Sequence, residues 1–307
     1  MHWRFKSLNF KILSMLPGGQ AFHGFTQEKI TGSTTATHDR IKQKVEVGLR
    51  YWDWLRAQER TNQVINGNLL DFGAGWHPTI PLLLHSFGNR SQLLVDIQPN
   101  LDAQKLTDTA RLLNQIITAP DFPHRNSCRT VPEIIPPPQP LLAAALQPLG
   151  IRYEAPFGDF TTRPAGEFDV VFCTQVLQHI SLRDQQAIFR QLCRALKPGG
   201  LIMGVVHLVG HFRNPNLRSG QYDHLTLSPW LWEHVINSSL MSYNRLKAPD
   251  YRSLLGESGF KILNFEVEQP TPADLAELGG VKIHPAFRRY APEELAARHI
   301  FFVAEKP

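Results

Sequence analysis

The sequence predicts a doubly wound α/β fold, and three observations carry that prediction. Residues 69–75 form an apolar strand that runs into an acidic residue and a Gly-x-Gly turn, which is how such a sheet opens a nucleotide-sized crevice. A second apolar strand, residues 92–95, ends in Asp96. Residues 168–174 and 201–206 are apolar runs typical of buried parallel strands.

The turn after the first strand carries the first candidate binding residues. Gly73 and Gly75 tolerate positive φ and let a ligand approach the backbone. The carboxylate of Asp71 can hold this loop or receive a ligand's ammonium group. Asp96 follows Gly75 by 21 residues, at the position from which such folds bind ribose hydroxyls.

Helical periodicity places helices around these strands. Apolar residues recur at helical spacing over 37–56, with Thr37 as N-cap, and a short apolar helix is expected over 80–87. Residues 106–117 carry an amphipathic stripe, so a further helix packs on the sheet. Residues 119–140 are rich in proline and predict an insertion loop.

The second half of the chain supplies the remaining elements. Residues 151–154 predict the third strand, and Ser181 is expected to cap a helix. The buried face of that helix is expected to contain Ile188, Phe189, Leu192, Ala195 and Leu196. Two late strands, residues 260–268 and 300–305, close the sheet and are separated by a polar stretch.

Composition limits the classes of protein that fit. The 307 residues include 42% hydrophobic residues, and 32 basic against 27 acidic residues give a net charge of +5. The basic residues are scattered, so the sequence does not call for a nucleic-acid partner. Cys128, Cys173 and Cys193 lack metal-ligand spacing and indicate a reduced, cytoplasmic protein. Residues 3–16 fit an amphipathic helix that packs on the protein or, less simply, contacts a membrane surface.

Four segments together resemble class I S-adenosylmethionine (SAM) dependent methyltransferases: the glycine turn, Phe168-Asp169-Val170-Val171, Val176-Leu177-Gln178-His179-Ile180, and Lys197-Pro198-Gly199-Gly200-Leu201. The rival is a nicotinamide-binding domain, whose fingerprint asks for a third glycine where this chain has Pro78. The methyltransferase pattern commonly has a glycine at the position of His77. The three later segments have no counterpart in the dinucleotide fingerprint.

The resemblance implies a seven-stranded Rossmann-like sheet whose last strand is antiparallel. It also implies a helical lid or cap over residues 1–65 and a SAM-dependent methyltransferase domain over 66–307. Insertions over about 208–258 and 271–298 are expected to carry the substrate pocket. Within the lid, Phe25, Thr26 and Gln27 would close over the cofactor.

The same resemblance assigns the cofactor contacts. Gly73 and Gly75 would approach the methionine part of SAM, Asp96 the ribose, and Asp159 with Phe160 the adenine. Asp159 is equally well explained as a turn residue. Gln175, at a strand's carboxyl end, would line the opening for methyl transfer. The full set of cofactor-binding candidates is Asp71, Gly73, Gly75, Asp96, Ile97, Asp159, Phe160, Thr174 and Gln175.

Histidines are the candidate general bases. His207 and His211 follow a strand that delivers them to the carboxyl edge of the sheet, where α/β folds bind ligands. His211 is the preferred base because it reaches farther from the strand, and His179 is expected in a structural role. The i, i+4 spacing of His207 and His211 suits a metal only on a helix, and the adjacent Gly210 predicts a loop, so no metal site is expected.

Residues 237–247 are rich in side chains that could hydrogen-bond a hydroxylated or anionic acceptor. This segment resembles one found in bacterial methyltransferases of small-molecule and sugar gene clusters, which implies acceptor contacts by Tyr243, Asn244 and Arg245. An ordinary solvated helix start explains the segment equally well. Trp230 and Trp232 are candidates for a sugar-stacking wall or for core packing.

The sequence therefore favours a SAM-dependent methyltransferase that acts on an oxygen or nitrogen of a small-molecule or glycan-like acceptor. Two alternatives remain at this point: a non-catalytic partner subunit with the SAM fold, and an NAD(P)-dependent oxidoreductase. The acceptor, the methylated atom, the pathway and the oligomeric state are left open.

Overall fold

The computed structural model describes residues 3–16, 35–134, 142–210, 220–238, 240 and 242–307. The lid residues 25–27 and the candidate base His211 lie outside these residues. No helix in the described part of the chain combines the length and apolarity that a membrane span needs.

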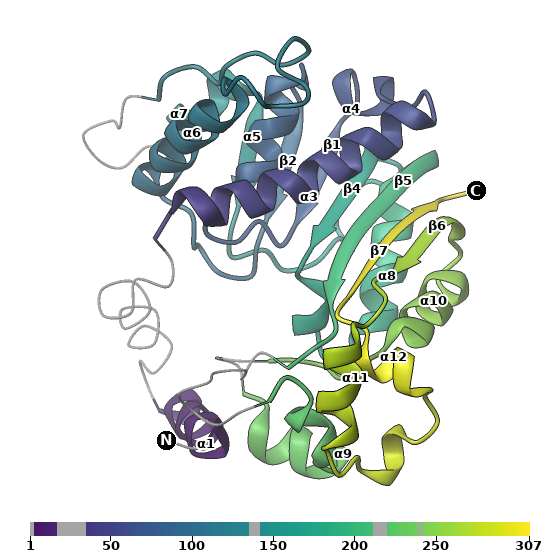
Figure 1. Cartoon of the computed structure of the whole chain (residues 1–307). Coiled ribbons are helices and arrows are strands. Elements are labelled where there is room, and N and C mark those ends of the chain that lie inside the picture. Colours follow the sequence, from purple (N-terminus) through teal and green to yellow (C-terminus); the bar gives the residue numbers. More distant parts are fainter. Residues whose placement is uncertain (1–2, 17–34, 135–141, 211–219, 239, 241) are drawn as a thin grey trace. The chain divides into compact units, whose positions relative to one another are not determined.

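Seven strands form one sheet in the order β3-β2-β1-β4-β5-β7-β6 (Figure 1). In chain order they are β1 Leu69–Phe72, β2 Gln92–Val95, β3 Ile151–Glu154, β4 Phe168–Thr174, β5 Leu196–His207, β6 Lys261–Val267 and β7 His299–Glu305. Strand β1 pairs in parallel with β2 and β4, and β2 pairs in parallel with β3. The hydrogen bonds between β5 and β7 follow an antiparallel register, so the predicted fold class is confirmed.

The chain divides into two compact units. Unit 1 comprises residues 1–33, 175–190 and 204–304, and unit 2 comprises residues 34–174, 191–203 and 305–307. The chain passes from unit 2 to unit 1 within β5, after Met203. The expected domain boundary between residues 65 and 66 stays a prediction.

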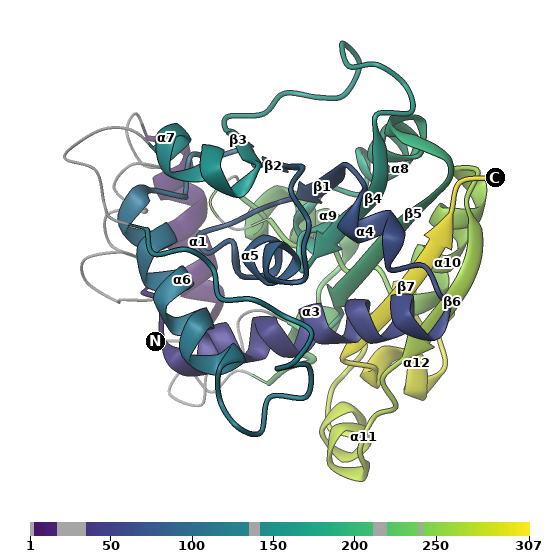
Figure 2. The same ribbon diagram turned by 90° about the horizontal axis from the view of Figure 1, so that it is seen from above.

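Unit 2 contains the first four strands and the helices that precede or connect them. These helices are α3 His38–Ala57, α4 Asn62–Ile65, α5 Thr79–Ser86, α6 Ala103–Ile117, α7 Leu142–Leu146 and the 3₁₀ turn η2 Gln147–Leu149. Side chains of Thr37 and Asp102 cap α3 and α6 by accepting backbone N–H groups. Helices α3, α5 and α6 pack against one another (Figure 2), and every residue of α5 is buried.

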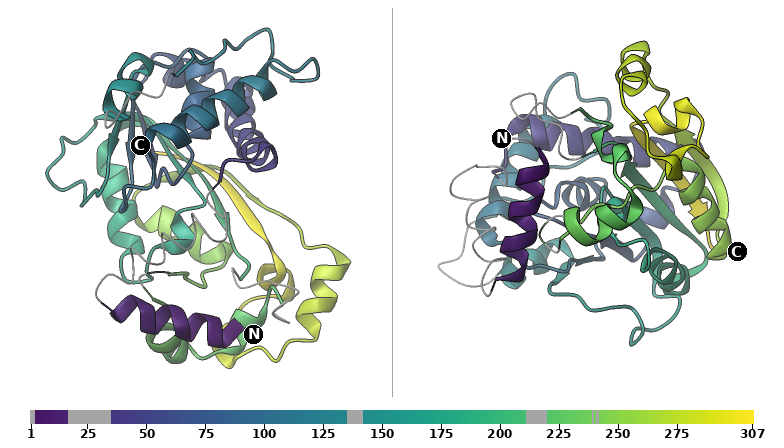
Figure 3. Two further views of the ribbon diagram at one scale, coloured as in Figure 1. Left: turned by 90° about the vertical axis from the view of Figure 1, so that its left-hand side faces the viewer. Right: turned by 90° about the horizontal axis from the view of Figure 1, so that it is seen from below.

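Unit 1 contains β6, most of β7 and a set of short helices. These are α1 Trp3–Met15, η3 Leu177–His179, η5 Asp223–Thr226, α9 Pro229–Leu231, η6 Trp232–Ile236, α10 Ala248–Glu257, α11 Pro272–Gly279, η7 Pro285–Phe287 and α12 Pro292–Ala296. Helix α1 lies beside η6 (Figure 3), and the ammonium group of Lys11 donates to the carbonyl of Asn237 at 2.8 Å.

One expectation about the region after β4 needs correction. Helix α8, Gln185–Ala195, is entered through a turn that starts at Ser181. As expected, Ser181 caps this entrance: its hydroxyl accepts from the amide of Asp184 at 3.3 Å and its carbonyl from the amide of Gln185 at 3.2 Å. Leu196 is the first residue of β5 rather than the last of the helix.

The interval between β6 and β7 is also more ordered than a polar stretch suggests. It contains α11, η7 and α12. The side chain of Thr271 caps α11, and prolines occupy the first turn of each element, which suits a helix start because proline lacks the N–H that would be unpaired there. Tyr222, Leu225, Leu278 and Phe287 belong to the buried cluster beneath these turns.

Candidate functional site

The loop after β1 has the backbone conformation that its glycines predict. The φ angles of Gly73 and Gly75 are 84° and 66°, in the left-handed region that favours glycine. The amides of Gly73 and Ala74 donate to the carbonyl of Val95 at 2.9 and 3.1 Å, which fixes the loop on β2. A Cβ atom added to Gly75 would meet no atom within 4 Å. The backbone therefore borders space that a ligand can occupy.

Asp96, directly after β2, ties three loops together. Its carboxylate accepts from the amides of Gly75 at 2.8 Å and Gln98 at 3.0 Å, and its carbonyl accepts from the amide of Phe157 at 2.8 Å. Each carboxylate oxygen has a second lone pair, so the group can also accept from ligand hydroxyls. The neighbouring Ile97 is 76% exposed, an unusual fraction for an isoleucine next to a buried strand.

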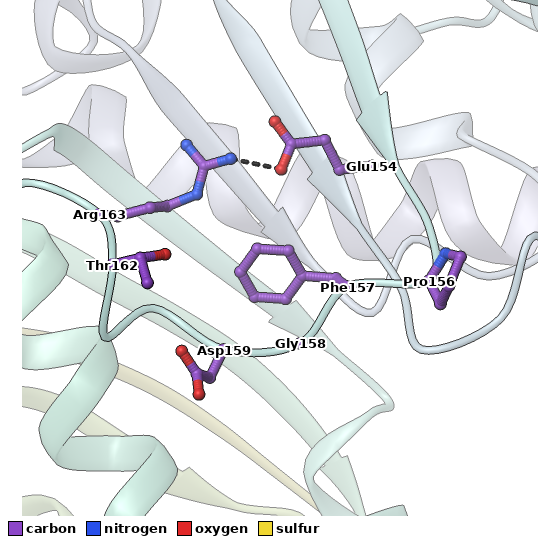
Figure 4. A pocket seen from close by; sticks show the side chains of 7 residues that line it. All are labelled: Glu154, Pro156, Phe157, Gly158, Asp159, Thr162 and Arg163. Atoms are coloured by element: carbon purple, nitrogen blue, oxygen red, sulfur yellow. Dashed lines mark hydrogen bonds and ion pairs between the residues drawn. The ribbon is translucent and has the colours of Figure 1, made fainter.

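The loop after β3 borders an open cavity of about 420 Å³ (Figure 4). The lining residues are Glu154, Pro156, Phe157, Gly158, Asp159, Thr162 and Arg163. Glu154 and Arg163 form an ion pair at one side of the ring of Phe157, and Asp159 lies at the other side. Hydrogen bonds from the hydroxyl and amide of Thr161 lower the pKa of Asp159. Asp159 is therefore an ionised acceptor at the cavity.

Phe160 supports this cavity from within the core. Only 2% of the residue is exposed, and its ring contacts those of Phe157 and Phe72 with centroid separations of 4.7 and 6.1 Å. Its amide donates to Gln191 at 3.2 Å, and its carbonyl accepts from Arg194 at 3.0 Å. Phe160 thus holds the ring of Phe157 in place.

Asp71 is buried at the end of β1 and has a cationic neighbour that the sequence reasoning missed. Burial raises the pKa of Asp71 to about 7, Lys44 opposes the rise, and Asp96 adds to it. The ammonium group of Lys44, on α3, donates to the carbonyl of His77 at 3.1 Å. The ring of His77 contacts the hydroxyl of Thr109 on α6 at 3.2 Å, so His77 is part of the buried core. Lys44 could not be assigned from sequence because its electrostatic effect on Asp71 depends on how α3 packs.

The end of β4 brings Thr174 and Gln175 to the carboxyl edge of the sheet. The Thr174 hydroxyl forms a 3.0 Å hydrogen bond with the phenol of Tyr51 from α3. Gln175 has a φ angle of 55°, and its amide donates to the carbonyl of Val205 at 2.8 Å. A left-handed glutamine costs roughly 1–3 kcal/mol, and such residues cluster at functional sites. The exposed Gln175 is therefore a candidate contact at this edge.

His207, the last residue of β5, is hydrogen-bonded to side chains that the sequence reasoning did not select. Its Nδ1 lies 2.6 Å from Nε2 of His299, and Nδ1 of His299 lies 2.5 Å from the carboxylate of Glu268. His299 begins β7 and Glu268 directly follows β6. An antiparallel strand beside β5 begins where β5 ends, so the predicted topology contained the signal that would have placed His299 here.

Tyr243 and Asn244 are buried in unit 1. The phenol of Tyr243 donates to the carbonyl of His207 at 3.3 Å. The amide side chain of Asn244 donates to the carbonyls of Leu177 and Ile180 at 2.9 and 3.0 Å. These contacts bind the segment around residue 244 to the loop after β4. The acceptor roles of both residues stay predictions.

Arg245 makes equally specific contacts within unit 1. Its guanidinium donates to the carbonyls of His224 and Leu227 at 3.0 and 2.6 Å. It also lies over the rings of Trp232 and Phe287, 4.8 and 4.7 Å from their centroids. Burial lowers the pKa of Arg245 to about 10. Its acceptor role stays a prediction.

Two further expectations concern His179 and a metal site. Nδ1 of His179 lies 2.7 Å from the carbonyl of Ser242. Within the described ranges, no three His, Cys, Asp or Glu side chains are grouped closely enough to hold a metal ion.

Comparison with known proteins decides the family. The methyltransferase domain family matches residues 38–264, which cover β1 to β5, the glycine loop and the first part of β6. The chain belongs to this methyltransferase family. It is therefore a SAM-dependent enzyme, and this membership decides against the nicotinamide oxidoreductase.

Solved structures similar to the methyltransferase include a SAM-dependent methyltransferase from Mesorhizobium loti, with 18% identity, 83% of this chain and 96% of that chain covered, and a TM-score of 0.42. A SAM-dependent methyltransferase from Methanosarcina mazei has 17% identity and a TM-score of 0.40, and the match covers 78% of this chain and 92% of that chain. Phosphoethanolamine N-methyltransferase 2 from Haemonchus contortus, solved with SAM, has 21% identity and a TM-score of 0.40. The match covers 78% of this chain and 48% of that chain. The search of curated proteins returned no match.

The residues of unit 2 fit SAM chemically. The space beside Gly75 can take a ligand, and burial raises the pKa of the Asp71 carboxyl group, so a ligand's ammonium group beside it would favour the ionised form. Asp96 offers oxygen lone pairs for a diol, and Asp159 offers an ionised acceptor beside the ring of Phe157. These groups match the amino acid, ribose and adenine ends of SAM.

Proposed function

We propose that the methyltransferase acts on an oxygen or nitrogen of a small-molecule or glycan-like acceptor, with a histidine of unit 1 as general base. The observation that carries the proposal is the state of His207. Burial lowers its pKa to about 4, and the cations around it act in the same direction. His207 is therefore a neutral imidazole at physiological pH, the form that can take a proton from a hydroxyl or an ammonium group.

Residues at and after the ends of β1 to β4 would hold the cofactor. Asp71 would receive the amino group of the methionine end, with Gly73 and Gly75 beside it, and Asp96 would bind the ribose hydroxyls. The adenine would lie against Ile97 and Phe157, with Asp159 accepting its amino group. Thr174 and Gln175 would border the sulfonium. Phe160, also expected to contact the adenine, would act through the ring of Phe157, which it contacts.

SAM supplies a methyl group whose transfer to an acceptor lone pair breaks the carbon–sulfur bond and leaves the bonding electrons on sulfur. The protein has two further tasks. It orients the acceptor for in-line attack, and a base takes the acceptor's proton. His207 would take that proton at Nε2, and His211 remains the alternative base.

The acceptor is proposed to contact residues around 243–245 and the exposed Trp230. Trp230 is 65% exposed and stacks on the ring of His234, whereas Trp232 is 1% exposed and belongs to the core. An exposed, supported indole ring is the surface on which a sugar or another flat apolar face can stack. This supports a glycan-like acceptor in which hydroxyl groups surround an apolar face.

A screen with radiolabelled methyl donor and soluble hydroxyl and amine acceptors, sugars included, tests the proposal. With the acceptor that is found, His207→Gln and His211→Gln should be compared at saturating SAM. Loss of the base should lower kcat by about 10²–10⁴-fold and leave SAM affinity unchanged. Unchanged kcat in both variants would exclude the histidine base. Transfer to carbon acceptors alone would exclude the proposed acceptor class.

A lid formed by residues 1–65 also remains a proposal. It would close over the cofactor and exclude water from the sulfonium. Cytoplasmic location and the absence of a nucleic-acid partner likewise remain expectations from composition.

A further inference from the structure

Three side chains from three neighbouring strand ends of unit 1 form a continuous hydrogen-bonded chain. We propose that Glu268 and His299 are positioning residues that fix the ring tautomer of His207, leaving the lone pair on Nε2 and stabilising the charge that His207 gains. This inference rests on the proposed function of His207 as base.

The geometry follows from the strand order β5-β7-β6. His207 ends β5, His299 begins the antiparallel β7 between them, and Glu268 follows β6, so the three residues lie in sequence along one edge. The backbone reinforces the arrangement, because the amide of Glu268 donates to the carbonyl of His299 at 3.0 Å. The side-chain separations of 2.5 and 2.6 Å then leave little freedom for either ring.

The direction of the hydrogen bonds determines the tautomers. An ionised carboxylate can only accept, so Nδ1 of His299 carries a hydrogen and donates to Glu268. With His299 in its neutral form, its Nε2 holds a lone pair and accepts from Nδ1 of His207. The remaining nitrogen of His207, Nε2, is consequently the basic one.

The groups around His207 explain why it needs His299 and Glu268 to stabilise a positive charge on its ring. Besides burial, the nearby cations Arg298 and Lys247 disfavour a positive charge on His207. A proton accepted at Nε2 makes the ring cationic. Its Nδ1 hydrogen can then shift toward Nε2 of His299, which moves the positive charge next to Glu268. The Nδ1 hydrogen shifts back before one proton leaves Nε2 of His207 for solvent, so one proton enters and one leaves.

The solvent exposure of the two positioning side chains predicts that His299 affects His207 more than Glu268 does. The side chain of His299 is 29% exposed and that of Glu268 is 47% exposed. Water can replace a half-exposed carboxylate in part, whereas no water replaces the ring that joins the two groups. His299→Phe should therefore perturb His207 more than Glu268→Gln does.

Nitrogen-15 NMR of histidine side chains in the full-length protein tests the tautomer without any acceptor. In the wild type, His207 should show a protonated Nδ1 and an unprotonated Nε2 between pH 6 and 8. Glu268→Gln should mix the two tautomers. Glu266→Gln is the matched control, since it removes the same charge from β6 two residues away. A protonated Nε2 in the wild type, or unchanged His207 signals in Glu268→Gln, would overturn the proposal.

Kinetics with the acceptor from the screen provides the second measurement. Glu268→Gln should lower kcat by about 10-fold or more, within the about 10²–10⁴-fold loss expected for the base itself, and shift the pH profile of kcat. KM for SAM should not change, and Glu266→Gln should behave as wild type. If His207→Gln retains full kcat, the proposed base is wrong whatever the NMR result. If His207→Gln loses kcat but Glu268→Gln retains both the wild-type kcat and its pH profile, the proposed positioning role of Glu268 is wrong. The proposal that His207 is the base is then unaffected.

Discussion

At the scale of single residues, Asp96 is the side chain whose loss should cost most in cofactor affinity. Its carboxylate already orders the amide of Gly75 and would accept both ribose hydroxyls. Losing charge-assisted hydrogen bonds of this kind costs roughly 1.5–3 kcal/mol, or about 10–150-fold in affinity. Calorimetry on Asp96→Ala should show this loss, with Asp108→Ala, an exposed acid on α6, as the unaffected control. Wild-type affinity in Asp96→Ala would remove the ribose assignment.

Asp71 should make cofactor binding depend on pH. Its pKa is raised by burial from 3.8 to about 7, so the free protein holds a proton there at pH 6 and has lost it at pH 8. An ammonium group binds only the ionised form, and SAM affinity should rise up to about tenfold per pH unit below 7 and level off above. Calorimetry between pH 6 and 8 measures the slope. Asp71→Asn should bind more weakly and lose the slope, and a slope that persists would assign it to another group.

The raised pKa of Asp71 should make the free energy of unfolding fall with rising pH, whereas SAM affinity should rise. Because the folded state holds the proton more tightly than the unfolded state does, the free energy of unfolding contributed by Asp71 is present below pH 4 and is lost as the pH rises toward 7. The site is therefore less stable at the pH where it binds best. This is the pattern of a carboxyl group kept for a ligand.

At the scale of elements, the glycine loop offers a matched pair of substitutions. Gly75 and Gly199 have φ angles of 66° and 73°, and a Cβ added to either would meet nothing within 4 Å. Alanine at each position should therefore cost a similar roughly 1–2 kcal/mol in stability. Only Gly75→Ala should weaken SAM binding, because only that Cβ enters the proposed cofactor space. Equal SAM affinity in the two variants would show that the cofactor does not approach this loop.

Element types were largely predictable where local sequence decides them. The cap at Thr37, the buried run of α5 and the apolar stripe of α6 are local signals, and each agrees with the structure. The end of α8 was predicted wrongly, because Leu196 is the first residue of β5. A buried apolar residue at such a boundary fits the inner face of a helix or of a strand, so sequence alone does not place the boundary.

The candidate site was predictable in the parts that follow strand ends. Asp71, Asp96 and Asp159 were selected because a strand or its turn delivers them to the carboxyl edge, and the structure has them there. Lys44 and Glu268 were missed, since each acquires its role from a partner that tertiary packing brings near. Long-range pairs of this kind carry no signal in spacing.

At the scale of the whole molecule, the lid and the packing of α3 can be separated by two truncations. Removal of residues 1–33 leaves unit 2 complete, and the variant should fold but bind SAM more weakly if the lid is real. Removal of residues 1–65 also deletes α3, whose buried side chains include Tyr51, Trp52 and Leu55. That variant should be insoluble or unfolded. Circular dichroism and SAM calorimetry distinguish the cases, and full affinity in the shorter truncation would contradict the lid.

The interleaving of the two units has a consequence for how such an enzyme can evolve. The chain changes unit after residues 33, 174, 190, 203 and 304. A recombination event with a single breakpoint therefore cannot transfer either unit intact to another gene. If unit 1 binds the acceptor as proposed, new acceptor preferences are expected to arise by substitution and insertion within its segments, while the segments of unit 2 are inherited alongside them.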